Sequence, residues 1–246
     1  MTPPIRRVLV VGGSSGIGRS LTVALGSRGH AVAVAARRAD AVAATVTAAG
    51  PTATGLVGDA SDADRCRTLV EEAAAALGGL DTVVYAAGAS PLGSVADATA
   101  SAWRDVLATN VIGAALTVSA ALDHLRSADD PLCVLLTSHS VGRPWPGLVP
   151  YAASKAALDQ LAAGLRAEEP WLRVVRVVVG PTATSFADGW DPDAAEPYFE
   201  RWAAAGYLDH RVLEPGEVAD RVLAVIDGSD RSNEVDAVGE RLSGDG

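Results

Sequence analysis

The chain has 246 residues, a hydrophobic fraction of 49% and a net charge of −10. This length fits one α/β domain, and the acidic charge argues against nucleic acid or an anionic membrane surface as a partner. Cys66 and Cys133 form neither a metal-ligand spacing nor a disulfide framework, so we expect no metal site and a cytoplasmic location. Residues 1–7 lack the apolar segment of a signal peptide, and no apolar run approaches the roughly 20 residues that span a bilayer.

A glycine-rich loop follows the first predicted strand, residues 8–11, and precedes a helical pattern. Its glycines, Gly12, Gly16 and Gly18, form a variant of the dinucleotide-binding fingerprint. Gly12 permits a tight turn, Gly16 lets the backbone approach a ligand, and Gly18 lets the helix pack close to the strand. A strand, loop and helix in this order hold a phosphate against helix N-terminal amides. The alternative is a plain glycine-rich turn.

The second predicted strand, residues 31–35, is followed by Ala36, Arg37 and Arg38. An NAD-binding chain usually places an acidic residue here for the ribose 2′-hydroxyl, whereas an arginine can pair with a 2′-phosphate. The sequence therefore predicts a preference for NADP(H) over NAD(H). The alternative is that both arginines only solvate the end of a strand.

The third predicted strand, residues 54–57, is followed by Asp59. A carboxylate at the carboxyl end of this strand could meet an adenine. In the next residues, Ser61 or Asp62 could cap the helix predicted over residues 65–77.

The fourth predicted strand, residues 82–85, runs into small residues that include Ala87 and Gly88. Small side chains let a flat ring or a ribose lie against the backbone. The next helix is predicted over residues 98–125 and contains Asn110, although asparagine is mildly unfavourable inside a helix. Asn110 could kink the helix, bond to the core backbone, anchor a water or orient a lysine.

The fifth predicted strand, residues 132–136, leads to Ser138, and a loop rich in proline and glycine leads on to the helix of Tyr151 and Lys155. Lys155 is the only lysine in the chain. Residues four apart share a helix face, so the ammonium can approach the phenol. A nearby cation should lower the pKa of the tyrosine and suit it to general acid–base work. The alternative is a surface tyrosine near a solvated lysine.

A sixth strand is predicted within residues 172–179, and aromatic residues collect over residues 185–211. The second stretch suits a flap over a ligand, although a subunit contact would look the same. Trp145, Phe186 and Trp190 could form an apolar substrate wall or simply pack in the core. His139 could line the same pocket or act as a second acid. A helix over residues 217–227 and a weak strand at 234–238 follow, and with no repeat or linker we expect one domain over residues 1–246.

With these motifs placed, the chain resembles the short-chain dehydrogenase/reductase family over about residues 7–184. The resemblance implies a Rossmann-like, doubly wound parallel sheet of about seven strands with helices on both faces. It also implies hydride transfer between a nicotinamide cofactor and a small-molecule carbonyl or alcohol, in a homodimer or homotetramer.

Carried over by position, Tyr151 resembles the proton donor, Ser138 the residue that hydrogen-bonds the carbonyl oxygen, and Lys155 the ribose anchor that lowers the tyrosine pKa. Asn110 resembles the residue that holds a water in the proton relay. The positions expected to contact the cofactor are Gly12, Ser14, Ser15, Gly16, Ile17, Gly18, Arg37, Arg38, Asp59, Ala60, Ala87, Gly88, Asn110, Tyr151, Lys155, Pro181 and Thr184.

The sequence departs from the family pattern in four places. Tyr85 stands where the family has asparagine, and the usual Pro-Gly after the sixth strand is reversed as Gly180-Pro181, which puts the Thr184 contact in question. Ser140 is a rival to Ser138, which we prefer for its thirteen-residue spacing from Tyr151. The glycine-rich C-terminal strand motif is absent, which puts the tetramer contact in question.

The leading interpretation is an NADP(H)-dependent oxidoreductase with Tyr151 as its general acid. The alternative of a different class is a non-catalytic NADP(H)-binding sensor or scaffold with the same fold. A third interpretation, an epimerase or dehydratase of sugar nucleotides, is disfavoured by the chain length and by the spacing of the glycine loop.

Overall fold

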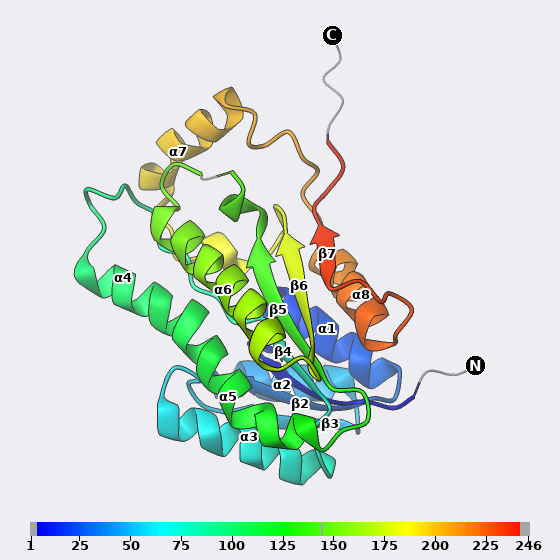
Figure 1. Cartoon of the computed structure of the whole chain (residues 1–246). Helices are drawn as coiled ribbons and strands as arrows, with labels where there is room; N and C mark the ends of the chain where they lie inside the picture. Colours follow the sequence, from blue (N-terminus) through cyan, green and yellow to red (C-terminus); the bar gives the residue numbers. More distant parts are fainter. Residues whose placement is uncertain (1–3, 144, 242–246) are drawn as a thin grey trace.

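The computed structural model describes residues 4–143 and 145–241, and Pro144 of the predicted proline- and glycine-rich loop lies outside them. In these residues, strands that pair in parallel form one seven-stranded sheet in the order β3-β2-β1-β4-β5-β6-β7 (Figure 1). The strands are β1 (Arg7–Val11), β2 (Ala31–Ala36), β3 (Ala53–Val57), β4 (Thr82–Tyr85), β5 (Leu132–Ser138), β6 (Arg173–Val179) and β7 (Glu234–Ala237). The predicted doubly wound parallel sheet is confirmed.

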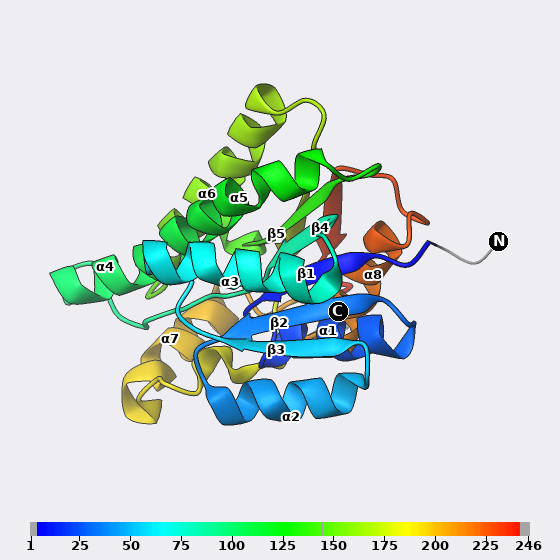
Figure 2. The ribbon, with the colours of Figure 1, turned by 90° about the horizontal axis from the view of Figure 1, so that it is seen from below.

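Helices cover both faces of the sheet (Figure 2). One layer contains α3, α5 and α6, and the other contains α1, α2 and α8. The helices are α1 (Gly16–Ser27), α2 (Ala39–Ala49), α3 (Ala63–Leu77), α4 (Ala100–Leu107), α5 (Gly113–Arg126), α6 (Val149–Glu168), α7 (Pro192–Ala204) and α8 (Pro215–Ile226). Asp62 caps α3 by accepting a hydrogen bond from the Arg65 amide, as one of the two predicted candidates.

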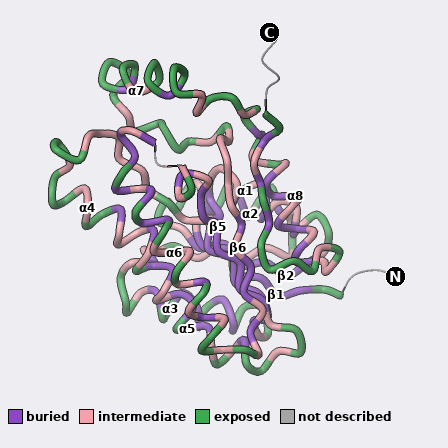
Figure 3. The backbone as a smooth tube through the Cα atoms, turned by 45° about the horizontal axis from the view of Figure 1, so that its top comes forward, coloured by how far each residue is buried: buried purple, intermediate pink, exposed green. Residues whose placement is uncertain are grey.

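The sheet is buried on both faces because its strands carry apolar residues at successive positions. In β1, Leu9 and Val11 belong to the core under α3, α5 and α6, whereas Val8 and Val10 belong to the core under α1 and α8. Figure 3 shows this buried centre surrounded by more exposed helices. Successive side chains of the strand thus point alternately into two hydrophobic cores, rather than into one core and the solvent.

The chain order reverses between β1 and β4, which lie side by side at the centre of the sheet. In such sheets the loops at the carboxyl ends of the strands leave a crevice at this point, where ligands bind. The glycine loop follows β1 there, and Ala86 after β4 donates its amide hydrogen to the Val11 carbonyl at 2.8 Å. The fold therefore brings the predicted cofactor loops together.

The helix predicted over residues 98–125 is present as a helical stretch from Ala100 to Arg126, but it is not α-helical throughout. A π-helical turn, Ala108–Ile112, separates α4 from α5. A π turn inserts one extra residue into the helical hydrogen-bond ladder and is common at functional sites. Here the widened turn holds Asn110, which is completely buried.

The combined helical stretch Ala100–Arg126 is long and apolar enough, by length and composition, to cross a membrane. Such a helix is not predicted from the sequence, because the sequence contains no apolar run of that length. In the fold, α5 packs against α3, and α4 packs against α6. A core helix of a globular domain passes the same test of length and composition.

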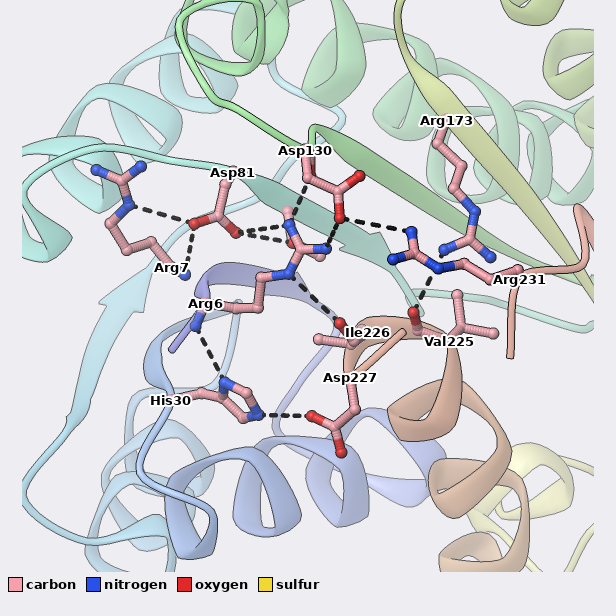
Figure 4. Close-up of polar contacts among 11 residues, drawn as sticks. Arg6, Arg7, His30, Asp81, Asp130, Arg173, Val225, Ile226, Asp227 and Arg231 are labelled. Carbon is pink, nitrogen blue, oxygen red and sulfur yellow. Dashed lines mark hydrogen bonds and ion pairs between the residues drawn. The ribbon is translucent and has the colours of Figure 1, made fainter. Parts of the chain in front are cut away.

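Charged side chains form a partly buried network at the amino ends of the strands, opposite the glycine loop (Figure 4). Arg6 is 5% exposed and donates to the Asp130 carboxylate at 2.6 Å, and it lies 3.9 Å from Asp81. His30 Nδ1 accepts the Arg6 amide hydrogen, so Nε2 carries the hydrogen that faces Asp227 at 3.0 Å. Buried charges are tolerated when they are paired. The network therefore links the amino ends of the strands to the end of helix α8. It leaves the carboxyl ends of the strands free for a ligand.

Candidate active site

One cavity of about 1090 Å³ runs along the carboxyl edge of the sheet. It is lined by Ser138 and by the predicted cofactor and substrate residues, with two exceptions, Gly18 and Asn110. Gly18 lies behind the loop, where an added Cβ would come within 3.0 Å of the Gly12 carbonyl carbon. That matches its predicted role in close packing of helix and strand.

The glycine loop forms a cradle that side chains would fill. Gly12 has a φ of +84°, and a Cβ there would lie 2.6 Å from the Ala87 Cα. Gly16 has a φ of +50° and faces Thr184 across the cavity, with a Cβ distance of 3.2 Å to the threonine methyl carbon. Ser15 precedes α1 without capping it through its side chain, so the first amides of the helix are left for another acceptor. These features fit the pyrophosphate of a dinucleotide.

Arg37 and Asp59 face each other at the other end of the cavity, 3.9 Å apart. Burial raises the pKa of Asp59, but hydrogen bonds from Ser61 and the charge of Arg37 outweigh it, so the pKa is lowered. The Arg37 side chain is 67% exposed, and an exposed ion pair at this distance contributes little stability. Its guanidinium is thus available to a ligand phosphate, with Arg38 beside it at the start of α2.

Ser138 ends β5, and its hydroxyl is near enough to the Tyr151 phenol to lower the pKa of that phenol. Its hydroxyl also accepts the Ser140 amide hydrogen at 3.1 Å and lies 2.9 Å from the Ser140 hydroxyl. Ser138 is therefore the serine that affects the tyrosine, whereas Ser140 is hydrogen-bonded to Ser138. This geometry favours Ser138 over its rival.

Lys155 is 5% exposed, and its Nζ donates to the Leu136 carbonyl at 2.8 Å. The same atom lies 5.8 Å from the centre of the Tyr151 ring, as the spacing on α6 predicted. Burial lowers the pKa of Lys155 to about 8, against the opposing charge of Asp159. An ammonium has three donors, so two remain for ligand hydroxyls.

The expected direction of the Tyr151 pKa is wrong. Burial raises the pKa of Tyr151 to about 12, and the Ser138 hydroxyl has a smaller opposite effect. Desolvation disfavours the phenolate more than the Ser138 hydroxyl favours it. Tyr151 is accordingly a protonated phenol at neutral pH.

Asn110 connects three elements through its side-chain amide. Its Oδ1 accepts the Ala89 amide hydrogen at 2.7 Å, and its Nδ2 donates to the Ala89 carbonyl at 3.0 Å and to the Ser154 hydroxyl at 2.8 Å. Ser154 in turn donates to the Tyr151 carbonyl. Of the predicted alternatives, the structure shows the core hydrogen bond. Sequence reasoning did not single out Ser154, although it lies inside the stretch from Tyr151 to Lys155.

Tyr85, which stands where the family has asparagine, is hydrogen-bonded to the π turn. It is 1% exposed, and its hydroxyl donates to the Thr109 carbonyl. Gly113 makes room for this hydroxyl, because an added Cβ there would collide with it. Tyr85 and Gly113 therefore form a matched pair next to Asn110, which the sequence did not reveal.

Aromatic side chains wall the cavity beyond Tyr151. The ring of Phe186 lies 5.0 Å from that of Tyr151, and Trp190 lies 5.5 Å from Phe186, both edge to face. Trp145 packs on Trp202 of α7 at 5.2 Å. The stretch predicted as a flap is a loop, a short 3-10 turn and α7, and its residues Phe186, Trp190 and Trp202 line the cavity. Sequence reasoning did not select Trp202.

His139 follows Ser138 and also lines the cavity. Its ring packs edge to face on His210 at 5.4 Å. Burial lowers the pKa of His139, and the charges of His210 and Arg143 add to the effect. A neutral imidazole at this place is a poor second acid at neutral pH.

Comparison with known proteins agrees with this geometry. The family model for short chain dehydrogenases matches residues 6–195. The chain belongs to the short-chain dehydrogenase/reductase family. As a member it is an oxidoreductase that acts on an alcohol or carbonyl group with NAD(P), and the family acts on small molecules and often forms oligomers.

Three relatives illustrate the similarity. The granaticin polyketide synthase putative ketoacyl reductase 2 of Streptomyces violaceoruber is 33% identical over 89% of this chain and 88% of its own length. A short chain dehydrogenase of Mycobacterium paratuberculosis, solved bound to NAD, has a TM-score of 0.84 and 26% identity over 93% of this chain and 94% of its own. The 3-oxoacyl-[acyl-carrier protein] reductase of Brucella melitensis has a TM-score of 0.83 and 27% identity over 98% of this chain and 92% of its own.

The pair Tyr85 and Gly113 yields a prediction on stability. Gly113→Ala should lower the free energy of unfolding by about 1–3 kcal/mol through overpacking. Tyr85→Phe should lower it by a similar amount, about 1–3 kcal/mol, because the Thr109 carbonyl loses its donor. In the double variant the phenylalanine leaves room for the new methyl group, so the loss should fall short of the sum by about 1 kcal/mol. Urea unfolding measures all three; strictly additive losses would contradict the contact.

Proposed function

We propose that the chain is an NADP(H)-dependent oxidoreductase that reduces a carbonyl group, or oxidises the corresponding secondary alcohol, with Tyr151 as the general acid–base. The observation that carries the proposal is that the Tyr151 phenol and the Ser138 hydroxyl, which lowers its pKa, line the same cavity as the glycine cradle. A carbonyl oxygen placed between the two hydroxyl groups would receive two hydrogen bonds.

The residues present fit a nicotinamide dinucleotide. The glycine loop would hold the pyrophosphate against the uncapped start of α1. Lys155 would donate its two remaining hydrogens to ribose hydroxyls, with Thr184 and Pro181 at the nicotinamide end. When bound, the cofactor supplies the hydride to the carbonyl carbon or accepts it.

The proton comes from the chain itself. Reduction develops negative charge on the carbonyl oxygen, and hydrogen bonds from Ser138 and Tyr151 aimed at that oxygen stabilise it. The pKa of about 12 keeps Tyr151 protonated, and an alkoxide is basic enough to take its proton. The buried ammonium of Lys155 lies near the phenolate that results and favours it electrostatically.

Selectivity for NADP(H) is assigned to Arg37, with Arg38 beside it. Arg37 lines the cavity and is largely exposed, and no acidic side chain occupies position 36. A guanidinium matches a phosphate through paired donors and has no such match with a ribose hydroxyl.

The proposed setting is a homodimer or homotetramer in the cytoplasm. Both cysteines, Cys66 and Cys133, are buried free thiols, which fits a reducing compartment. Burial raises the pKa of each, to about 12 for Cys133, so neither thiol is a nucleophile at neutral pH.

Tyr151→Phe tests the reaction. Removal of the proton donor should lower kcat by a factor of about 10² to 10⁴. NADPH binding should persist, because the glycine loop and Lys155 remain. Tyr198→Phe, which removes a hydroxyl from the flap, is the matched control and should keep its activity. Turnover by Tyr151→Phe at the wild-type rate would refute the role of the tyrosine, and NADPH binding without turnover by the wild type would favour a sensor.

Arg37→Ala tests the cofactor. The Kd for NADPH should rise about tenfold, since a charged hydrogen bond to phosphate contributes about 1.5–3 kcal/mol and exposure reduces it. The Kd for NADH should not change. Arg67→Ala, an equally exposed arginine on α3, is the control. Equal affinity of the wild type for the two cofactors would contradict the assignment.

The pH profile tests the buried lysine. With a pKa lowered to about 8, Lys155 is charged below that pH and neutral above it, whereas Tyr151 stays protonated up to about 12. The kcat/KM for reduction reports ionisations of the free enzyme. It should therefore fall as pH rises through about 8, and Lys155→Met should lose that step. A profile that is flat up to pH ~10 in the wild type would contradict the assignment.

A further inference from the structure

The part of the cavity beyond Tyr151 has an apolar rim as well as aromatic walls. Four of its lining side chains are large, hydrophobic and exposed, namely Phe186, Phe199, Leu208 and Val212. They come from the segment that contains α7, which lies over the carboxyl ends of β5 and β6 (Figure 1). Exposed apolar side chains gathered at the mouth of a pocket indicate an apolar ligand.

The same end of the cavity offers no cation to an anionic ligand. Among the described lining residues, the arginines are Arg37 and Arg38, at the cofactor end, and the one lysine is the proposed ribose anchor. Asp191 is the charged residue at the substrate end, and it caps α7. Nearby Arg143 lies over the Tyr207 ring at 4.0 Å and donates to the Gly206 carbonyl at 2.8 Å. A carboxylate or phosphate on the substrate would therefore lack a counter-charge and meet Asp191.

One hydrogen-bond donor in this wall has no acceptor among the described residues. Trp145 is 9% exposed, lines the cavity, and its indole Nε1 is buried and unpaired. Two other tryptophans of the wall are satisfied, because Trp190 donates to the Ser90 carbonyl at 2.7 Å and Trp202 to the Pro146 carbonyl at 2.9 Å. An indole N–H can only donate, so its missing partner is an acceptor.

Two more unpaired polar atoms belong to residues that line the same cavity. The Ser90 hydroxyl and His139 Nδ1 are buried without a partner among the described residues. Burial lowers the pKa of His139, so its ring offers neutral hydrogen bonding rather than charge. A buried polar atom without a hydrogen-bond partner raises the free energy of the folded protein. A ligand that supplies the missing partner removes this cost and therefore binds more tightly.

We propose that the substrate of this site is an uncharged ketone, or the corresponding alcohol, with an apolar carbon skeleton and a second oxygen atom that accepts a hydrogen bond from Trp145. This inference rests on the reductase function proposed above. It separates the chain from enzymes whose substrate is carried on a phosphate-bearing arm, because such an arm needs cations at the pocket mouth. Trp145 is then a specificity-determining residue, while Tyr151 and Ser138 act on the reacting carbonyl.

Three matched ring ketones test the proposal. Ethyl 4-oxocyclohexanecarboxylate has the second oxygen and no charge, 4-oxocyclohexanecarboxylate adds the charge, and 4-butylcyclohexanone lacks the second oxygen. With NADPH and the full chain, we expect the kcat/KM of the ester to exceed that of the anion by at least about tenfold. We expect it to exceed that of the alkyl ketone by about three- to tenfold, the range of one neutral hydrogen bond.

Trp145→Phe keeps an aromatic ring and removes the donor. It should reduce the advantage of the ester over the alkyl ketone to about one, chiefly through a higher KM for the ester. Trp171→Phe is the control, because that tryptophan lies outside the cavity and its Nε1 bonds to Glu169. An anion reduced as well as the ester, or an advantage of the ester that survives in Trp145→Phe, overturns the proposal.

A second readout separates this proposal from the function on which it rests. Trp145, Trp190 and Trp202 line the cavity, so quenching of tryptophan fluorescence reports binding without turnover. If no ketone is reduced but the ester binds in preference to the anion, and loses that preference to the alkyl ketone in Trp145→Phe, the substrate class stands and the reductase function fails. If ketones are reduced but the ester neither binds nor reacts better than the anion, the substrate class fails alone.

Discussion

The site depends on the side-chain amide of Asn110, whose three hydrogen bonds join the loop after β4 to helix α6. A regular helix would turn this side chain elsewhere, so the hydrogen bonds require the π turn that separates α4 from α5. Ser154 passes the constraint on to the backbone of Tyr151. The strand that borders the cofactor cavity and the helix that carries the proton donor are thereby held in one geometry.

Burial is the second constraint, and it acts in opposite directions on the two key groups. It raises the pKa of Tyr151 and lowers that of Lys155, because each charged form loses hydration. The phenol is thus held as an acid. The pKa of the ammonium is only modestly above neutrality, and its hydrogen-bond partner among the described residues is the Leu136 carbonyl. An acid that remains protonated beside a cation ready to stabilise its conjugate base suits the reduction of a ketone.

Much of this arrangement is predictable from the sequence, because it rests on local patterns. The glycine loop and the shared face of Tyr151 and Lys155 need only short spacings, and the family resemblance implied the doubly wound sheet. The remainder depends on contacts between distant residues. The Trp190 indole donates a hydrogen bond to the carbonyl of Ser90, one hundred positions earlier. Tyr85 bonds to a π turn, which residue propensities do not predict. The pKa of Tyr151 was predicted in the wrong direction because spacing gives the approach of a cation but not the depth of burial.

The central claim is that the glycine cradle, Lys155 and the paired hydroxyls of Tyr151 and Ser138 serve one nicotinamide cofactor. A crystal structure of the chain with NADP⁺ tests it most directly. We expect the pyrophosphate on the loop from Gly12 to Gly18, a ribose hydroxyl on the Lys155 ammonium, and the nicotinamide facing the two hydroxyl groups. A dinucleotide bound elsewhere, or a nicotinamide directed away from Tyr151, would contradict it.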